Sequence, residues 1–131
     1  MARSVKPTRS KLVAKLDRIF SEFIRKRDTD GGFGRCISCG KIITYDTSDC
    51  GHYVNRKHMS TRFDEQNCNA QCRSCNRFDE GNIQGYRKGL IAKYGEKIVD
   101  MLEYKKYNVS CMGVNELEIL IKHYKQKIKE L

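Results

Sequence analysis

Apolar residues recur at helical spacing in the N-terminal part of the chain. They are Leu12, Val13, Leu16, Ile19, Phe20, Phe23 and Ile24, and they fall on one stripe of a 3.6-residue period. This pattern predicts an amphipathic helix over residues 10–28, with Ser10 as its N-cap and Gly31-Gly32 ending it. Residues 1–9 before it are polar and basic, and we expect them to form an arm.

The same period returns in residues 83–131, which we expect to be helical. Asn82 is a good N-cap and Gly95 a good terminating residue for a helix of about three turns, and a further helix should follow at 96–103. The last apolar stripe comprises Leu117, Leu120, Ile121, Tyr124, Ile128 and Leu131, after an approximate capping box of Asn115 and Glu118. This last helix can pack on the N-terminal helix or form a dimer contact, and we favour packing within the chain.

The segment between these helical parts, residues 36–82, carries β and turn signals instead. Lys41–Tyr45 and Gly51–Val54 are short, rich in β-branched and aromatic residues and bounded by turn formers, which predicts a hairpin that carries His52. A Cys-x-x-Cys pair stands on either side of this hairpin, formed by Cys36, Cys39, Cys72 and Cys75. Four cysteines in this arrangement are typical of a structural Zn²⁺ site, which leaves no open position for water.

Zinc binding would draw the hairpin, the connecting loop and the residues after Cys75 against one another. The sequence therefore predicts an α+β fold in a single domain, with a zinc-stapled ββα core flanked by an N-terminal helix and C-terminal helices. The remaining cysteines, Cys50, Cys68 and Cys111, are interpreted as small buried hydrophobic residues. The chain shows neither an apolar leader nor a run of roughly 18 apolar residues, so we expect a cytoplasmic protein without a membrane partner.

The formal net charge is +10 over 131 residues, and residues 1–41 hold eleven of the 26 basic residues against four acidic ones. Such a surplus indicates a polyanionic partner, and nucleic acid is the usual one. The residues predicted to contact the phosphate backbone of the nucleic acid are Arg25, Lys26, Arg27, Arg56, Lys57, Arg62 and Arg77. The first three also suit the negative end of the helix dipole. No platform of aromatic and basic residues is evident, so duplex or branched DNA is favoured over an extended single strand, and no small-molecule substrate is expected.

A few polar residues near the cysteine pairs suit phosphodiester hydrolysis, which needs a base for water, a divalent cation and a group that holds the base in place. His52 is the candidate base, because its ordinary pKa leaves it largely neutral at pH 7. Asn76 and Asp49 offer oxygen ligands of the kind that Mg²⁺ accepts. Asn67 can fix the loop or the imidazole through its amide.

These motifs resemble a known family. A Cys-x-x-Cys, a Gly-His on a hairpin, an asparagine five positions before the second pair and a final Cys-x-x-Cys-Asn resemble the zinc-bearing HNH (His-Me finger) endonucleases. The stretches CISCG, Asp-x-Gly-His-Tyr, Arg-Phe-x-Glu-x-Asn-x-x-x-Gln-Cys-x-x-Cys-Asn and Gly-Asn-x-x-x-Tyr-Arg-x-x-Leu-Ile are more specifically similar to the NinG (Rap) family of phage recombination endonucleases. They lie in order within residues 20–103.

The resemblance implies a nuclease that uses Mg²⁺ or Mn²⁺ and acts on branched recombination intermediates, Holliday junctions or D-loop-like DNA, in a bacterial host cell. It implies that His52 is the general base, Asn67 the middle residue of the HNH signature and Asn76 a metal ligand at its last position. The four paired cysteines match the zinc ligands. Resolving a four-way junction takes paired nicks, which favours a homodimer.

The chain departs from the HNH pattern at Gly51, where many members have an acidic metal ligand before the base. Asp49 is the expected ligand in its place, Glu80 is an alternative, and Glu65 can instead hold the loop. Two other classes of function stay open. A non-catalytic zinc module that binds DNA needs the same cysteines but no His52, and a thiol redox protein needs a βαβ context around one cysteine pair, which is absent.

Overall fold

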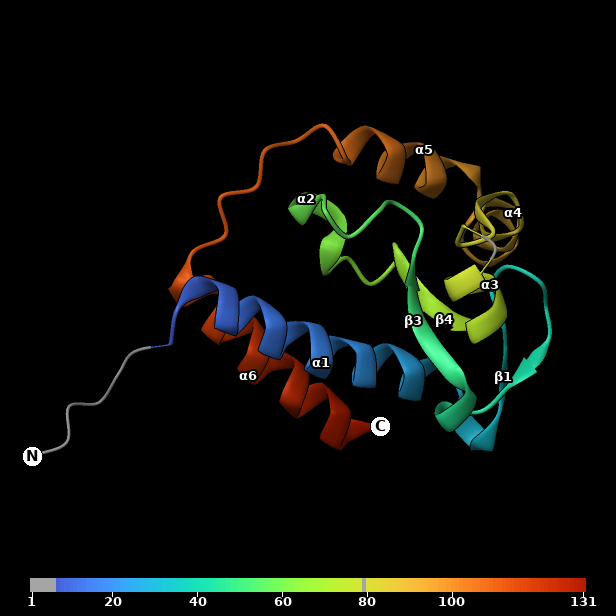
Figure 1. Cartoon of the computed structure of the whole chain (residues 1–131), viewed down its shortest axis with the longest axis horizontal. Helices are drawn as coiled ribbons and strands as arrows, with labels where there is room; N and C mark the ends of the chain where they lie inside the picture. Colours follow the sequence, from blue (N-terminus) through green and yellow to red (C-terminus); the bar gives the residue numbers. More distant parts are fainter. Residues whose placement is uncertain (1–6, 79) are drawn as a thin grey trace, which may run out of the picture.

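The computed structural model describes residues 7–78 and 80–131, so the first six residues of the predicted arm lie outside the described residues. In chain order the elements are α1 (Arg9–Asp28), a 3-10 turn (Asp30–Gly32), β1 (Gly34–Arg35), β2 (Ile42–Ile43), a second 3-10 turn (Tyr45–Thr47), β3 (Ser48–His52), α2 (Met59–Arg62), β4 (Cys68–Cys72), α3 (Arg73–Phe78), α4 (Ile83–Tyr94), α5 (Glu96–Lys105) and α6 (Val114–Glu130). The fold is mixed α+β with small antiparallel sheets (Figure 1). Among the described residues, no helix is long and apolar enough to cross a membrane.

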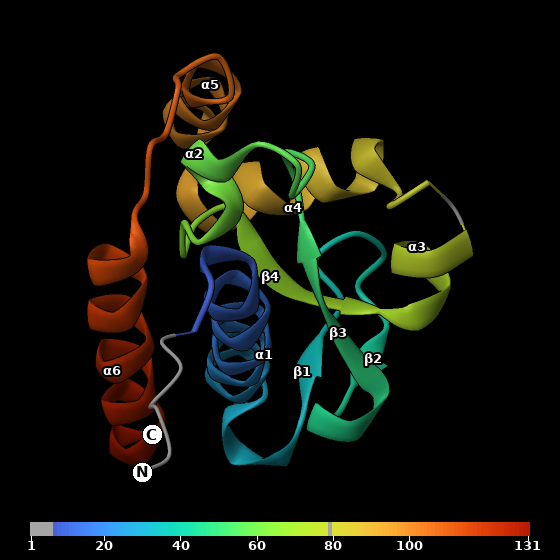
Figure 2. The same cartoon turned by 60° about the vertical axis from the view of Figure 1, so that its left-hand side comes forward.

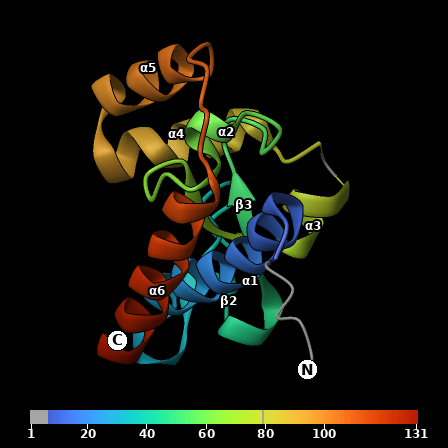
Figure 3. The same ribbon diagram turned by 90° about the vertical axis from the view of Figure 1, so that its left-hand side faces the viewer.

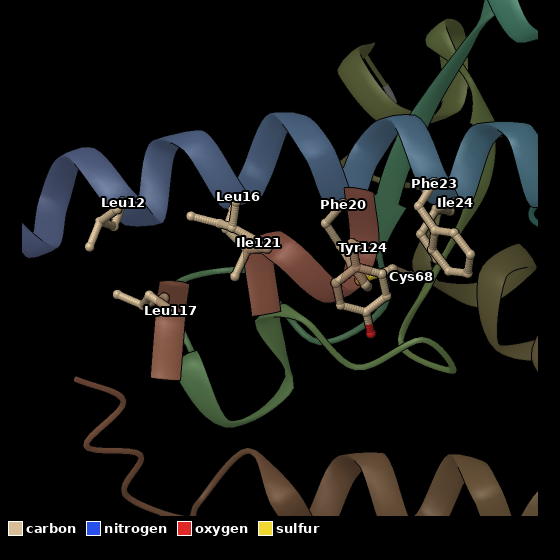
Figure 4. Packing of buried hydrophobic residues seen from close by; sticks show 9 residues of the cluster. All are labelled: Leu12, Leu16, Phe20, Phe23, Ile24, Cys68, Leu117, Ile121 and Tyr124. Atoms are coloured by element: carbon tan, nitrogen blue, oxygen red, sulfur yellow. The ribbon is translucent and has the colours of Figure 1, made fainter. Parts of the chain in front are cut away.

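The two longest helices, α1 and α6, lie side by side (Figure 3). Their apolar stripes meet in one cluster, which Cys68 of β4 joins: Leu12, Leu16, Phe20, Phe23, Ile24, Leu117, Ile121 and Tyr124 (Figure 4). The rings of Phe20 and Tyr124 meet edge to face with centroids 4.9 Å apart, an arrangement that aromatic pairs favour. The predicted packing of the last helix within the chain is confirmed.

The starts of these two helices differ from the sequence prediction. α1 has Thr8, rather than Ser10, as its N-cap. α6 begins directly after Gly113, so Asn115 already lies in its first turn and the predicted capping box with Glu118 is wrong. Because both stripes begin several residues inside their helices, the apolar pattern does not locate the first residue.

The strands pair differently from the predicted hairpin. β1 pairs with β2, and β3 pairs antiparallel with β4, in a register that places His52 opposite Cys68. The predicted pairing of residues 41–45 with 51–54 is wrong, because a 3-10 turn redirects the chain between them. β4 escapes prediction although its sequence alternates, because its five residues are Cys, Asn, Ala, Gln and Cys and include none of the β-branched or aromatic residues that mark a strand, and its two polar residues are buried like the others.

α4 packs against the first Cys-x-x-Cys turn, and in Figure 2 it lies above α1 and α6. Asn82 caps it by accepting a hydrogen bond from the Gly85 N–H at 3.3 Å, and Gly95 ends it, both as predicted. A Cβ on Gly89 would collide with the Ile37 carbonyl, so only glycine allows this approach. A second core cluster joins α4 and α5 to the residues after β3: Tyr53, Val54, Tyr86, Leu90, Val99 and Leu102.

Candidate metal centre and catalytic cleft

The four cysteines of the two Cys-x-x-Cys pairs converge. The sulfur atoms of Cys36, Cys39, Cys72 and Cys75 all lie within 4.8 Å of one another, and those of Cys39 and Cys72 are 3.8 Å apart. Two backbone N–H groups and the Asn82 amide donate hydrogen bonds to these sulfurs at 3.4 Å, and such donors stabilise the thiolates of a metal site. The cluster can therefore hold a zinc ion in a closed, four-thiolate site.

This cluster ties the helix that carries Asn76 to the sheet. Cys72 is the last residue of β4, and Cys75 lies in the first turn of α3. In the first cysteine turn, the Ile37 N–H donates to the Ala70 carbonyl at 3.1 Å, so that turn also rests on β4. A metal ion bound here would fix α3, and with it Asn76, against the strands.

His52 ends β3 and is held by one hydrogen bond. Its Nε2 lies 3.0 Å from the backbone carbonyl oxygen of Arg62. Because a carbonyl can only accept, Nε2 carries the proton and Nδ1 is left as the basic nitrogen. Burial lowers the pKa of His52 below its ordinary value, although the bond to Arg62 acts in the opposite direction. The imidazole is therefore neutral at pH 7, which is the form that a general base requires.

Asn67 is fully buried and braces the loop that carries the Arg62 carbonyl. Its amide accepts a hydrogen bond from the Val54 N–H at 2.8 Å. The same amide donates to the carbonyls of Val54 and Thr61, each at 3.1 Å. Asn67 thus holds the loop on both sides of the segment 55–60 and acts on His52 only through the backbone.

Tyr86 of α4 adds a second brace, which the sequence analysis does not predict. Its buried hydroxyl donates to the carbonyls of Gly51 and Asn67, at 2.8 and 3.1 Å. Gly51 also has a steric role, because a Cβ there would collide with the side-chain amide of buried Gln71. A larger side chain at the position before His52 would therefore have to displace the Gln71 side chain.

Asp49 of β3 and Asn76 of α3 meet directly. The Asn76 amide donates to the Asp49 carboxylate at 3.0 Å, and Arg77 donates to both carboxylate oxygens at 2.9 and 3.0 Å. Burial alone would raise the pKa of Asp49, but the hydrogen bonds from Arg77 and Asn76 outweigh it and keep this pKa below its ordinary value. The carboxylate is therefore ionised, as an oxygen ligand of a hard divalent cation must be.

His52, Asp49 and Asn76 all line one cleft of about 450 Å³. Its wall also holds four arginines, Arg25, Arg56, Arg73 and Arg77, and a second acid, Asp17. A further cleft of about 610 Å³ shares His52, Arg56 and Asn76 with it and adds Glu80. The structure therefore gathers the candidate base, both candidate metal ligands and a set of cations around one hollow, which we call the catalytic cleft.

The other predicted site residues lie outside the catalytic cleft. Arg62 and Arg27 are each held by an aspartate through two hydrogen bonds. Lys26 pairs with a glutamate one turn earlier on α1, and Lys57 lines a separate cleft. Glu65 accepts a hydrogen bond from a tyrosine of α6 at 3.1 Å, so it holds that helix against the loop.

Two charged residues of the catalytic cleft, Arg73 and Asp17, are missing from the sequence prediction. Arg73 could have been identified from its position in the sequence. It lies inside the second Cys-x-x-Cys and is the first residue of the helix that also carries Asn76. Asp17 carries none, because it lies on the polar face of α1, where charged residues are expected in any amphipathic helix.

The three remaining cysteines differ in burial. Cys68 is fully buried and Cys50 half-buried, but Cys111 is exposed, so the interpretation as a buried residue is wrong for Cys111, which lies in the segment between α5 and α6. The sulfurs of Cys50 and Cys68 lie within 4.8 Å of a ring nitrogen of His52. Burial raises the pKa of the Cys68 thiol well above its ordinary value, and it also raises the pKa of Cys75 in the four-cysteine cluster, to about 12. The four-cysteine cluster offers the four thiol ligands of a structural zinc site, whereas the group around His52 offers three ligands, so the four-cysteine cluster is the better zinc site.

Comparisons with known proteins give the family. The chain matches the family model described as Bacteriophage Lambda NinG protein over residues 2–131. It is 36% identical over 129 residues to protein ninG of Escherichia phage 933W, 35% over 129 residues to that of Escherichia phage lambda, and 35% over 131 residues to that of Salmonella phage P22. Each alignment covers 98% of this chain but only 60% or 61% of the relative, so the chain spans less than two thirds of these proteins. No solved structure matches. The resemblance to the NinG family is thereby confirmed, and the chain belongs to the NinG family of phage proteins.

Proposed function

We propose that this protein is a metal-dependent DNA endonuclease of the HNH type that cuts branched recombination intermediates, Holliday junctions or D-loop-like DNA. The observation that carries the proposal is the setting of His52, a neutral imidazole oriented by the Arg62 carbonyl in a cleft that also holds Asp49 and Asn76. In this proposal β3, β4 and α3, with the cysteine cluster, form the zinc-stapled ββα core. The choice of branched DNA comes from the resemblance of the motifs to recombination endonucleases.

In the proposed reaction, His52 removes a proton from water through Nδ1. The water oxygen forms a bond to phosphorus, the bond to the leaving sugar oxygen breaks, and that oxygen takes up a proton from solvent. The Asp49 carboxylate and the Asn76 amide oxygen would hold a Mg²⁺ or Mn²⁺ ion, which supplies positive charge at the scissile phosphate. Arg77 has to leave Asp49 for this, and its side chain is 54% exposed, so it is free to turn toward a phosphate.

The arginines of the catalytic cleft suit the phosphate backbone on either side of the cut. Arg56 and Arg73 are exposed side chains on different elements of the cleft wall, so together they can contact phosphates of different nucleotides. Paired nicks at a four-way junction would require two copies of the chain, and we therefore propose a homodimer on such DNA, in the cytoplasm of a bacterial host.

One observation favours a second candidate, a non-catalytic zinc module that binds DNA and recruits a partner. Both oxygens of Asp49 are already occupied by Arg77 and Asn76, so the metal ligands are closed to a cation in this state. A recruiting module would use the arginines and cysteines and would have no use for a neutral, oriented His52.

The test compares the unaltered protein, His52→Ala and the matched control His123→Ala, which changes an exposed histidine of α6. Zinc-loaded proteins are incubated with labelled single-stranded, linear duplex, nicked and four-way-junction DNA, with Mg²⁺, with Mn²⁺ or with no added divalent ion. We expect metal-dependent cuts near the branch, lost by a factor of about 100 or more in His52→Ala only. If all three proteins bind DNA equally and none cuts it, the nuclease proposal is wrong and the recruiting module stands.

A further inference from the structure

A third cleft, of about 680 Å³, adjoins the cleft of about 610 Å³, and aromatic and basic side chains are prominent in its lining. Tyr104 and Tyr107, at the end of α5, are 73% and 77% exposed, and Lys57 and Lys106 stand among them. We propose that this aromatic cleft binds unpaired bases of the branched DNA by stacking them on Tyr104 and Tyr107. This inference rests on the proposed function. It gives a binding site to the part of the DNA substrate that lies outside the catalytic cleft.

The aromatic cleft is a fixed surface rather than a loose end of the chain. α5 lies over α2 in all views (Figures 1 to 3), and the Ser60 hydroxyl of α2 donates to the Lys105 carbonyl at 2.7 Å. The Lys105 ammonium also pairs with Asp64 at 3.1 Å. The end of α5 is therefore tied to the loop that braces His52, and the exposed tyrosines are presented at a set place.

The chemistry of this cleft suits a nucleotide. The Lys106 ammonium lies 5.0 Å from the centroid of the Tyr107 ring, which places a cation for phosphate beside a ring for a base. The acid of this cleft, Glu103, accepts a hydrogen bond from the Tyr53 hydroxyl at 2.5 Å and lies 3.8 Å from Arg87. Its charge is thereby partly balanced, so it does not cancel the attraction of the lysines for a polyanion.

A strand of DNA has a continuous route between the two sites. The cleft of about 610 Å³ shares His52, Arg56 and Asn76 with the catalytic cleft, and shares Tyr53, Asn55 and Ile83 with the aromatic cleft. Bases inside a duplex are covered on both faces by their neighbours, whereas bases at a branch or in a single-stranded arm have a face free for a tyrosine. No platform of aromatic and basic residues is evident in the sequence, whereas the structure gathers Tyr104, Lys106 and Tyr107 with Lys57, about 50 positions away, around one cleft.

The experiment measures binding, so it does not depend on cleavage. The probes are a duplex with a single-stranded arm that carries 2-aminopurine and a fully paired duplex with the same number of phosphates, without added divalent ion. The variants are Tyr104→Ala/Tyr107→Ala, the conservative Tyr104→Phe/Tyr107→Phe and the control Phe33→Ala, an exposed ring before β1. We expect the alanine pair to bind the armed duplex about tenfold or more weakly and to lose the quenching of 2-aminopurine, whereas the phenylalanine pair and Phe33→Ala keep both.

Two outcomes would overturn the inference. One is an equal loss of affinity for both duplexes in the alanine pair, which would mean a general loss of phosphate contacts or of fold. The other is unchanged quenching of 2-aminopurine by the alanine pair. If sedimentation velocity then shows that the unaltered protein is a dimer and the alanine pair a monomer, the cleft is a contact between copies of this chain. If the tyrosines quench 2-aminopurine as expected but the unaltered protein cuts no DNA in the His52 experiment, the nuclease proposal is wrong and the stacking proposal stands.

Discussion

The carbonyl of Arg62 decides which nitrogen of His52 can act as a base, and burial lowers the pKa of the imidazole. A general base must be neutral, so cleavage should rise with pH and reach a plateau once the imidazole is deprotonated. Because the pKa of His52 is lowered, we predict a midpoint below the ordinary value of about 6.5. The measurement is the single-turnover rate across that pH range at constant ionic strength. His123→Ala should leave the midpoint unchanged, and a midpoint above the ordinary value would argue against a neutral, buried base.

Tyr86 is a residue whose role is to keep His52 in place, because its hydroxyl holds the carbonyls of Gly51 and Asn67. Tyr86→Phe leaves these buried groups without that donor, and we predict a loss of about 1–3 kcal/mol in the free energy of unfolding. Cleavage should also slow, since Gly51, which precedes the proposed base, and Asn67, which braces its loop, both lose a hydrogen bond. Urea denaturation of the zinc-loaded protein measures the first effect. Tyr107→Phe, at an exposed position, is the control, and equal stability of the two variants would contradict the role given to Tyr86.

The predictability of single residues depends on whether the chemistry lies in a side chain. His52, Asp49 and Asn76 can be picked out from the sequence, because the first two lie between the cysteine pairs and Asn76 directly follows the second pair, and the structure brings all three to one cleft. The Arg62 carbonyl cannot be picked out, because every residue has one. Asn67 is recognisable as a signature position, but only its buried contacts show that it holds a loop.

At the scale of elements, helices with a one-sided apolar stripe are predictable and the strands are not. α1 and α6 pack together because each carries a stripe that can be covered only by another apolar surface. β3 and β4 lack an apolar stripe of this kind: β3 consists of Ser, Asp, Cys, Gly and His, and the polar residues that alternate along β4 are buried asparagine and glutamine. Their pairing depends on contact between the two cysteine turns. The spacing of the cysteines in the sequence predicts this contact but does not give the register of the two strands.

The contact of α4 with the first cysteine turn gives a prediction about metal retention. Replacing glycine by alanine inside a helix usually stabilises it by about 0.5–1 kcal/mol. At Gly89 we predict the opposite sign, because the added Cβ collides with the Ile37 carbonyl and pushes α4 away from the turn that holds Cys36 and Cys39. Gly89→Ala should therefore unfold at a lower temperature and lose zinc faster to a chelator. Lys88→Ala, at the neighbouring exposed position, should do neither, and a stabilised Gly89→Ala would refute this packing.

At the scale of the whole molecule, α1 connects the core to the catalytic cleft. One side of this helix is buried against α6, while its residues Asp17 and Arg25 line the cleft. α6 lines none of the clefts described above, although its exposed residues include Lys122, Lys125 and Lys129. The positive charge of the chain is thus divided between arginines of the cleft, which we propose bind DNA, and lysines that line none of these clefts.

This division predicts how binding should depend on salt. Each phosphate contact that a variant loses lowers the slope of log affinity against log salt concentration by about 0.9 for duplex DNA. We predict that change for Arg56→Ala, whose side chain lines both the catalytic cleft and its neighbour. Lys125→Ala, which removes an equal charge from the exposed face of α6, should keep the slope of the unaltered protein. Titrations of a paired duplex at several salt concentrations measure both slopes. If the two variants changed the slope equally, the net charge of the protein rather than the cleft would determine binding. Only a contact between a particular side chain and a phosphate makes the loss of Arg56 differ from the loss of Lys125.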